Sequence, residues 1–386
     1  MKCKYVMISD SESEKFRILM NGPLPPPYGG MQIYCQDFLR SSLMTQFNVR
    51  FCRAILLPSV FETHGLVRFV LRCLNSFLIT LVWVSQLLFY RPHIAHVHTN
   101  SYSGFYIKGL LAVLARLNGA KTILHIHGGA FKQFYDSMPG FMRALIKWMI
   151  NINSAVIVLS KEWKQYFVSI GANTNKLVVL TNSVFIPDLM EKTEKSNKVN
   201  ILFLNRFDKE KGIYELVEAI DRNRNETCSC RYILAGPKTY HWQAISEKVR
   251  QLNLNEYVEM PGVVFGDAKD EIYKKADIYV LPSYIEGMPI GLLEAMSYGL
   301  ACITTPVGGI PDIVDNGQNA LLVKTGDVGA LAESLRKLIF DSELRKRLGK
   351  EARATVVAKY NWQQRTCEIA QLYLNVIEGK NLSHSD

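Results

Sequence analysis

The chain has 386 residues, nearly half of them apolar and none in a low-complexity tract, which is the composition of a globular protein long enough for two domains. Its formal net charge of +10 would suit a nucleic acid, an anionic membrane or a phosphate-bearing substrate. The sequence contains no recognition helix, zinc finger or RNA-binding motif, so nucleic acid is the weakest of these partners. The eight cysteines form no C-x-x-C pair and no disulfide pattern, which favours reduced thiols.

The charge is unevenly spread along the chain. Residues 1–195 hold 21 Lys and Arg against 10 Asp and Glu, a surplus of +11, whereas the remainder has a net charge of −1. The first sixteen residues contain too short an apolar run for a secretion signal. We therefore expect a cytoplasmic protein whose first half is basic.

In the first half, short apolar runs alternate with helical stretches. KFRILMNG (15–22) reads as a strand, and the loop GPLPPPYGGMQ leads to an amphipathic helix expected from about Ile33 to Leu43. Further strands are expected at HIAHVHT (93–99), TILHIHGG (122–129) and SAVIVLS (154–160). This alternation predicts a parallel, doubly wound α/β sheet.

One apolar segment competes with this prediction. Residues 73–90, CLNSFLITLVWVSQLLFY, carry no charge and approach the length that spans a bilayer. The segment lies between two predicted elements of one sheet, where a membrane span would split the domain. The pattern therefore favours a buried core helix, and a helix lying in the membrane surface or a true span remain open.

A polar, charged stretch without periodicity, EKTEKSNK (191–198), is the best linker in the sequence. We therefore predict one domain at 1–195, a second domain at 196–360, and a last helix at about 361–380. Strands of the second domain are expected in six runs: VNILFLNRF, RYILAGP, YVEMPGVV, ADIYVLPS, ACITTPVGG and ALLV. Ligands of such sheets bind outside the carboxyl ends of the strands, where the motif-bearing loops fall.

Two glutamates bracket a predicted helix start in SYIEGMPIGLLEAMSYG. Pro289 suits a first helical turn, so the helix is expected from Pro289 to Tyr298, with Gly299 as its stop. Glu286 then precedes the helix, and Glu294 lies about one turn inside it. Free N–H groups at a helix start can hold a phosphate, and carboxylates accept hydrogen bonds from sugar hydroxyls. Together these features outline a nucleotide-sugar site.

Three other stretches offer complementary chemistry. Arg206 follows a predicted strand and Lys211 comes five residues later, so two cations could neutralise a diphosphate at that strand end. Gly29 and Gly30, before the first helix, would let backbone N–H groups approach a phosphate or an acceptor. His127 ends a predicted strand and enters a glycine loop, whereas His125 lies inside the strand. No Asp-x-Asp occurs in the sequence, and no metal site is expected.

The segment from Glu286 to Glu294 resembles the E-x7-E signature of the retaining glycosyltransferases of family 4, which have the GT-B fold of two Rossmann-like domains facing a central cleft. The resemblance implies that Glu286 contacts the donor sugar and that Glu294 binds the ribose hydroxyls. It also places the pyrophosphate on Arg206 and Lys211, although Asn205 stands where the family often has glycine. The resemblance further implies that the first domain binds the acceptor and that the last helix packs back on it. The second domain would bind the donor, with Gly287, Met288 and Pro289 lining the donor site. His127 matches a position that approaches the donor sugar, and Gly29 and Gly30 match the N-terminal glycine loop.

The resemblance implies a retaining, metal-independent hexosyltransferase that uses a nucleoside-diphosphate sugar and needs no cofactor. Its basic first half and apolar segment suggest a glycan or lipid-linked acceptor, as in surface-polysaccharide assembly, and contact with an anionic membrane at its cytoplasmic face. A nucleotide-sugar isomerase of the same fold and a non-catalytic sugar-nucleotide-binding scaffold remain alternatives. A glycosidase is less favoured, because its two carboxylates would have to flank one scissile bond.

Overall fold

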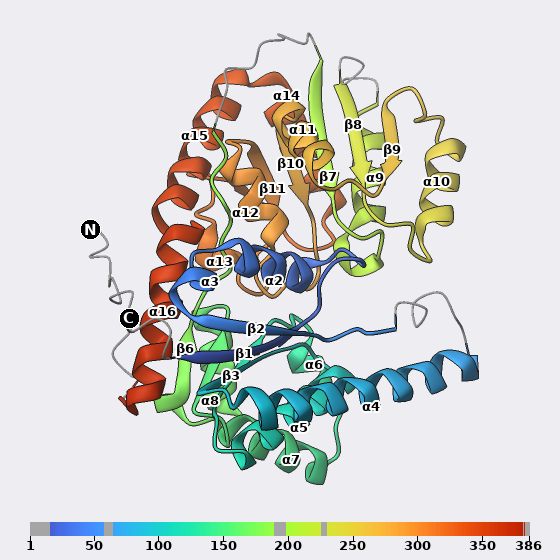
Figure 1. Cartoon of the computed structure of the whole chain (residues 1–386). Coiled ribbons are helices and arrows are strands. Elements are labelled where there is room, and N and C mark those ends of the chain that lie inside the picture. Colours follow the sequence, from blue (N-terminus) through green and yellow to red (C-terminus); the bar gives the residue numbers. More distant parts are fainter. Residues whose placement is uncertain (1–15, 58–64, 189–197, 225–229, 381, 383–386) are drawn as a thin grey trace. The chain divides into compact units, whose positions relative to one another are not determined.

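The computed structural model describes residues 16–57, 65–188, 198–224, 230–380 and 382 (Figure 1). The N-terminal segment and nearly all of the expected linker at 191–198 lie outside the described residues. The chain divides into two compact units: the N-terminal unit combines Met1–Asn182 with Trp362–Asp386, and the C-terminal unit is Ser183–Asn361. The division falls before the predicted boundary at 195/196. Val184 pairs with Asn361, and the Arg353 guanidinium donates to the Pro187 carbonyl at 2.9 Å, which ties residues 183–187 to the second unit.

The N-terminal unit is built on a six-stranded parallel sheet of order β2-β1-β3-β4-β5-β6. Its strands are β1 (Arg17–Gly22), β2 (Asn48–Arg53), β3 (Ile94–Thr99), β4 (Lys121–Ile126), β5 (Ala155–Val158) and β6 (Leu177–Val179). Its helices are α2 (Gly30–Arg40), α3 (Leu43–Gln46), α4 (Gly65–Tyr90), α5 (Ser103–Leu117), α6 (Phe131–Asp136), α7 (Gly140–Asn151), α8 (Lys161–Ser169) and α16 (Trp362–Glu378). The predicted doubly wound α/β architecture is confirmed.

The first helix differs from its prediction. It was expected at about Ile33–Leu43, with Gly29 and Gly30 in the loop before it. Gly29 is instead the extended N-cap, Gly30 is the first helical residue, and α2 ends at Arg40. The helix stops there because the Ser41 hydroxyl and N–H both bond to the Phe38 carbonyl, at 2.6 and 3.1 Å. Of the rest of the expected helix, Leu43 begins a separate helical turn, α3, and Ser41 and Ser42 lie between the two helices.

The apolar segment forms most of α4, and its favoured reading as a buried core helix is wrong. Among the described residues, α4 is the one helix long and apolar enough to cross a membrane, and only 6% of its most apolar window is buried. The four buried side chains are in its second half: Ile79, Trp83, Leu87 and Tyr90. Trp83 anchors it, with the indole N–H donating to the Leu111 carbonyl at 2.9 Å.

The C-terminal unit has a second six-stranded parallel sheet, of order β12-β11-β10-β7-β8-β9. Its strands are β7 (Val199–Leu204), β8 (Cys230–Ala235), β9 (Val258–Gly262), β10 (Ile278–Leu281), β11 (Ala301–Thr304) and β12 (Leu321–Leu322). Its helices are the 3-10 turn η3 (Lys209–Lys211), α9 (Ile213–Arg222), α10 (Trp242–Gln251), α11 (Asp267–Lys275), α12 (Ile290–Ser297), α13 (Ile310–Ile313), α14 (Val328–Phe340) and α15 (Ser342–Lys359).

The strand order determines where a ligand can bind. In the C-terminal sheet the order runs one way from β7 to β9 and the other way from β10 to β12, so the loops after β7 and β10 diverge to opposite faces. Such a switch point is where open α/β sheets hold their ligands. In the N-terminal sheet the corresponding point lies between β1 and β3. Each unit packs its own hydrophobic core against its sheet.

Candidate active site

The loops after β7 and β10 are tied together at the switch point of the C-terminal sheet. The Tyr284 N–H donates to the Glu210 carbonyl at 2.8 Å. Gly212 follows at φ +68°, and a Cβ there would lie 2.1 Å from the Pro282 carbonyl oxygen. Only glycine permits this approach, so the turn that carries Lys211 is fixed against the loop that carries Glu286.

This contact brings together two of the predicted residues. The Lys211 ammonium lies 2.7 Å from Oε1 of Glu286 and donates to the Ile285 carbonyl at 3.1 Å. The Ser283 hydroxyl donates to the same carboxylate oxygen at 2.8 Å. The side chains of Lys211 and Glu286 are 20% and 9% exposed, so both charges are largely withdrawn from water. The two opposite charges compensate each other in this largely buried position.

Arg206 is placed differently from Lys211. Its side chain is 59% exposed and forms an ion pair with Asp208. Its backbone N–H donates to Oδ1 of Asn205 at 2.8 Å, so the residue that replaces the family's glycine caps the loop through its own side chain. A Cβ on Gly236 would lie 1.8 Å from the Asn205 carbonyl oxygen, so close backbone packing is preserved by a glycine on the neighbouring strand end.

Glu294 is held by residues that the sequence did not indicate. The Lys269 ammonium lies 2.5 Å from Oε1, and the Tyr273 hydroxyl donates to Oε2 at 3.0 Å. Burial and the Glu294 carboxylate raise the pKa of Tyr273, which keeps its hydroxyl protonated as a donor. The Tyr298 ring stacks on Tyr273 with centroids 5.1 Å apart. Glu294 is therefore oriented by one cation and one hydroxyl.

The helix between these carboxylates begins at Ile290, one residue later than predicted, with Pro289 as its N-cap. It ends at Ser297, and the expected stop Gly299 is left-handed at φ +74°. No side chain caps its first turn, so the N–H groups there are not engaged by a cap.

The loop before this helix is fixed by two glycines after β11. The Gly309 N–H donates to the Gly287 carbonyl at 2.6 Å. A Cβ on Gly308, at φ +56°, would lie 2.0 Å from the Glu286 carbonyl oxygen. Met288 is 4% exposed, so of the three predicted loop residues it serves mainly as packing. Close backbone contact therefore determines where Glu286 points.

In the N-terminal unit, the two predicted glycines have room around them. A Cβ on Gly30 would meet nothing within 4 Å, and one on Gly29 would meet only the Gln32 side chain. Neither glycine has a left-handed φ, so the fold does not require glycine at either position. The open space is compatible with a ligand that approaches the start of α2.

His127 lies just beyond the end of β4 and contacts two other histidines. Its Nε2 lies 2.9 Å from Nδ1 of His98, so one proton is shared between the two rings. Its ring stacks on His125 with centroids 4.0 Å apart. Burial, reinforced by His96, lowers the pKa of His127 to about 3. The side chain is therefore a neutral hydrogen-bonding group at physiological pH and not a cation.

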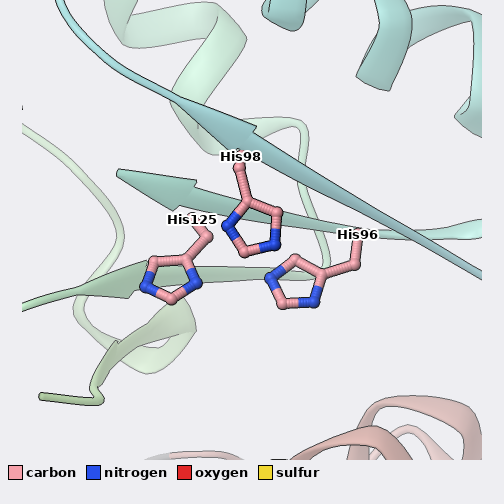
Figure 2. Close-up of side chains that lie close together, drawn as sticks. All are labelled: His96, His98 and His125. Atoms are coloured by element: carbon pink, nitrogen blue, oxygen red, sulfur yellow. The ribbon is translucent and has the colours of Figure 1, made fainter. Parts of the chain in front are cut away.

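Beside His127, three fully buried histidines gather on β3 and β4: His96, His98 and His125 (Figure 2). Figure 2 shows a nitrogen of each ring turned toward the other rings. The Tyr373 hydroxyl bonds to Nδ1 of His96 at 2.7 Å, and neither nitrogen of His125 has a hydrogen-bond partner among the described residues. The pKa values of His98 and His125 lie well below the usual range, because burial disfavours the charged ring.

These three rings could together bind a transition metal ion. One nitrogen from each lies within 4.8 Å of the others. Zinc bound at about 2.0–2.1 Å would draw them to about 3.4 Å from one another, so the rings would have to move together. The absence of a metal remains a prediction from the sequence.

The structure thus brings Lys211 to Glu286 and places Glu294 on the helix that follows. A common neighbour links the two carboxylates: both raise the pKa of buried Tyr279, although burial is the larger cause. Sequence reasoning missed Ser283, Lys269 and Tyr273, which carry no motif. The histidine cluster had a signal, since two H-x-H repeats on adjacent strands put the histidines of each strand on one face.

Two family models match consecutive parts of the chain. The glycosyl transferase 4-like domain matches residues 46–183, and the glycosyl transferases group 1 model matches residues 185–355. The second match contains Arg206, Lys211, Glu286 and Glu294. The first contains His127.

Curated relatives and solved structures agree with these matches. A glycogen synthase of Mycobacterium tuberculosis is 22% identical over 300 residues, which cover 75% of this chain and 70% of the relative. A putative colanic acid biosynthesis glycosyltransferase, WcaL of Salmonella typhimurium, is 26% identical over 56% of this chain and 55% of its own.

Among solved structures, a sucrose-phosphate synthase from Thermosynechococcus elongatus has a TM-score of 0.78 at 19% identity, covering 95% of this chain and all of its own. Anabaena HepE in complex with UDP-glucose has a TM-score of 0.70 at 15% identity, covering 93% and 100%. At such low identity these structures establish the fold alone. With the family models, they show that the chain belongs to the family 4, group 1 glycosyltransferases and is a transferase with the GT-B fold.

Proposed function

We propose that the chain transfers a sugar, with retention at the anomeric carbon, from a nucleoside-diphosphate sugar that binds at the switch point of the C-terminal sheet. The observation that carries this proposal is the Lys211–Glu286 ion pair at 2.7 Å, beside Arg206 and the uncapped start of α12. A diphosphate needs cations and N–H donors, and a sugar needs carboxylate acceptors. The loops at the carboxyl edge of the C-terminal sheet supply both the cations and N–H donors and the carboxylate acceptors.

Each residue has a role in this proposal. Lys211 and Arg206 stabilise the charge that develops on the departing diphosphate. Lys211 also holds Glu286 in place for the sugar hydroxyls, with the help of Ser283. Glu294, oriented by Lys269 and Tyr273, accepts from the ribose hydroxyls. We assign no protein nucleophile, in line with the front-face mechanism that the family resemblance implies.

The donor class has support from a relative of known structure. Anabaena HepE was solved with UDP and with UDP-glucose, and its fold matches this chain over 93% of the length. We extend to this chain the class of ligand, a nucleoside diphosphate carrying a sugar. Because the site already holds basic side chains, we propose that transfer needs no divalent metal.

For the acceptor, we propose a glycan or lipid-linked precursor of a surface polysaccharide, met at the cytoplasmic face of an anionic membrane. A colanic acid biosynthesis glycosyltransferase and a lipopolysaccharide outer core galactosyltransferase are among the similar proteins. The surplus of +11 over residues 1–195 favours an acceptor that carries phosphate or lies at an anionic surface.

The first test is thermal unfolding of the purified chain against a panel of nucleoside diphosphates and their sugars, with chelator present. One nucleotide should raise the melting temperature with concentration, since a ligand at 100 times its Kd adds about 2.7 kcal/mol. Lys211→Ala and Glu294→Ala should abolish the shift. Lys346→Ala, which removes an equally basic but 73% exposed side chain on α15, should leave it unchanged.

The same panel separates the alternatives. Conversion of a sugar nucleotide without acceptor would identify an isomerase, and binding without turnover on any supplied acceptor would favour a scaffold. No shift with any nucleotide would refute the donor site. A shift that appears only when a divalent metal is added would refute metal independence.

A further inference from the structure

Among the described residues, the first half of α4 is a largely exposed apolar surface, tied to the preceding loop through Asn75, whose Oδ1 accepts from the N–H groups of Leu56 and Leu57 at 2.8 and 3.0 Å. None of its residues from Gly65 to Leu78 is buried, and large exposed side chains recur along it. They are Leu66, Phe69, Val70, Leu74 and Phe77, with Phe69 63% and Phe77 60% exposed, and Leu81 follows in the second half. Figure 1 shows this half of α4 extending past the other helices of the N-terminal unit. So long an exposed apolar stripe is rare on a soluble monomer and marks an interaction surface.

Neighbouring helices on the same face of the sheet also expose apolar side chains. α4 packs against α5, and α5 packs against α7, so the three helices cover one face of the N-terminal sheet (Figure 1). On α7, Phe141, Leu145 and Trp148 are exposed at spacings of four and three residues, which places them on one side of the helix. On α5, Leu117 is 80% exposed. We call α4, α5 and α7 together the apolar face.

The positive charge of the apolar face indicates what kind of partner it binds. α4, α5 and α7 contain no Asp or Glu, whereas they contain six basic residues: Arg68, Arg72, Lys108, Arg116, Arg143 and Lys147. Arg72, Arg116 and Lys147 are exposed beside the apolar side chains. In the C-terminal unit, by contrast, α11 and α15 carry acidic residues in their first turns. Apolar side chains interleaved with cations and no anions suit a bilayer with anionic headgroups.

The packing of α4 decides how it meets a bilayer. Its second half is held in the unit by Trp83, by the Arg50–Gln86 hydrogen bond at 3.1 Å, and by the Tyr90 hydroxyl on the Asn48 carbonyl. A membrane span would have to break these contacts and take Trp83 out of the core. A helix that lies in the interface keeps all of them.

We infer that the apolar face of α4, α5 and α7 docks on an anionic bilayer, with the first half of α4 inserted flat among the headgroups. The inference deepens the proposed membrane location by naming the surface that makes the contact. It does not depend on the transfer reaction. Docking would hold the chain where a lipid-linked acceptor is found.

The test is flotation of the full-length chain with phosphatidylcholine vesicles, with and without phosphatidylglycerol. The chain should float with the anionic vesicles at low salt and less at high salt, because salt screens the basic side chains. Phe69→Glu should weaken binding about tenfold or more, since it puts a charge on the inserted stripe. The matched control is Phe340→Glu on α14, where the side chain is 62% exposed but belongs to the C-terminal unit, and it should bind as wild type. Arg72→Ala should cost about fivefold on anionic vesicles only.

A second measurement does not depend on the folding of a variant in α4. Brominated lipid should quench Trp148, which is 50% exposed on α7, and this part of the quenching should be lost in Trp148→Phe.

The inference is wrong if wild type does not float at low salt, or if Phe69→Glu and Phe340→Glu float equally. A dimer that Phe69→Glu dissociates, with no vesicle binding, would assign the face to a second copy of the chain instead. None of these assays contains donor or acceptor. A chain that floats but transfers no sugar would refute only the proposed function.

Discussion

The carboxyl edges of the two sheets hold their polar groups in different ways. In the C-terminal unit each candidate acid faces a base: Glu286 faces Lys211, and Glu294 faces Lys269. In the N-terminal unit the polar groups around His127 are neutral histidine rings, several of them stacked on one another. Even the buried lysine of that unit, Lys108, bonds to the neutral side chain of Asn21, and burial lowers its pKa to about 7.

This difference shows what each edge can bind. At an edge with ion pairs, the fold has already positioned the cations, so they can bind a diphosphate without rearrangement. Buried neutral rings resist charging and offer hydrogen bonds and shape instead. The C-terminal edge is thus suited to the anionic donor, and the histidine cluster is suited to position a neutral group. Four predictions test this comparison.

Loss of the Lys211 ammonium, whose side chain is only 20% exposed, should have the largest effect on transfer. We expect Lys211→Ala to lower transfer by about 10²–10³, in line with the removal of one preorganised donor from a developing charge. It also leaves the Glu286 carboxylate, 9% exposed, without its counter-ion. Steady-state kinetics against the Lys346→Ala control would measure the loss. A tenfold loss or less would mean that Lys211 is structural.

Acid should destabilise the N-terminal unit first. His96 and His127 have pKa values of about 3 against 6.5 in the unfolded chain, so unfolding takes up protons between these values and stability falls as the pH decreases. These two histidines together should lower the free energy of unfolding by roughly 3 kcal/mol per pH unit between pH 6 and 4. Hydrogen exchange at decreasing pH should show β3 and β4 losing protection before β7 and β10.

A variant sharpens the pH prediction. His125→Phe removes another histidine of lowered pKa, so the dependence of unfolding on pH should become shallower. Equal loss of protection in both units would contradict this account.

The next largest effect should be a difference in stability between glycine substitutions at the two sheet edges. Gly308→Ala puts a Cβ 2.0 Å from the Glu286 carbonyl at φ +56°, so we expect a loss of about 2 kcal/mol or more of unfolding free energy and misplacement of Glu286. Gly30→Ala meets no atom within 4 Å and should change stability by less than about 0.5 kcal/mol. Denaturant unfolding measures both. If Gly30→Ala nevertheless raises KM, a ligand approaches the start of α2.

The orientation of Glu294 should have the smallest effect of the four. Lys269→Met removes the cation at 2.5 Å but leaves the Tyr273 hydrogen bond, so we expect about tenfold weaker nucleotide binding. Lys274→Met on the same helix, half exposed and paired with Glu271, is the control and should bind as wild type. Titration calorimetry with the nucleotide found in the first screen would measure both. Unchanged affinity in Lys269→Met would mean that Tyr273 alone positions Glu294.

The sequence by itself determined that the chain forms two parallel sheets, and that a helix begins between Glu286 and Glu294. Strand–helix alternation is local, and the strands at 93–99 and 122–129 were recognisable from apolar runs that end in polar or glycine residues. The stop at Gly299 was likewise local, because glycine adopts the left-handed conformation that ends a helix. The start of α2 was missed, because a glycine pair before a helix reads as loop.

Only the tertiary structure decided which residues meet. Ser283 and Lys269 reach the two glutamates through loop and helix packing that no sequence spacing encodes. The fate of residues 73–90 was also decided there, because an apolar run has the same composition whether a core covers it or not. Trp83 is buried against the core, whereas Phe69 and Phe77 of the same helix are exposed. Burial depends on neighbours distant in sequence, so it becomes fixed only when the chain has folded.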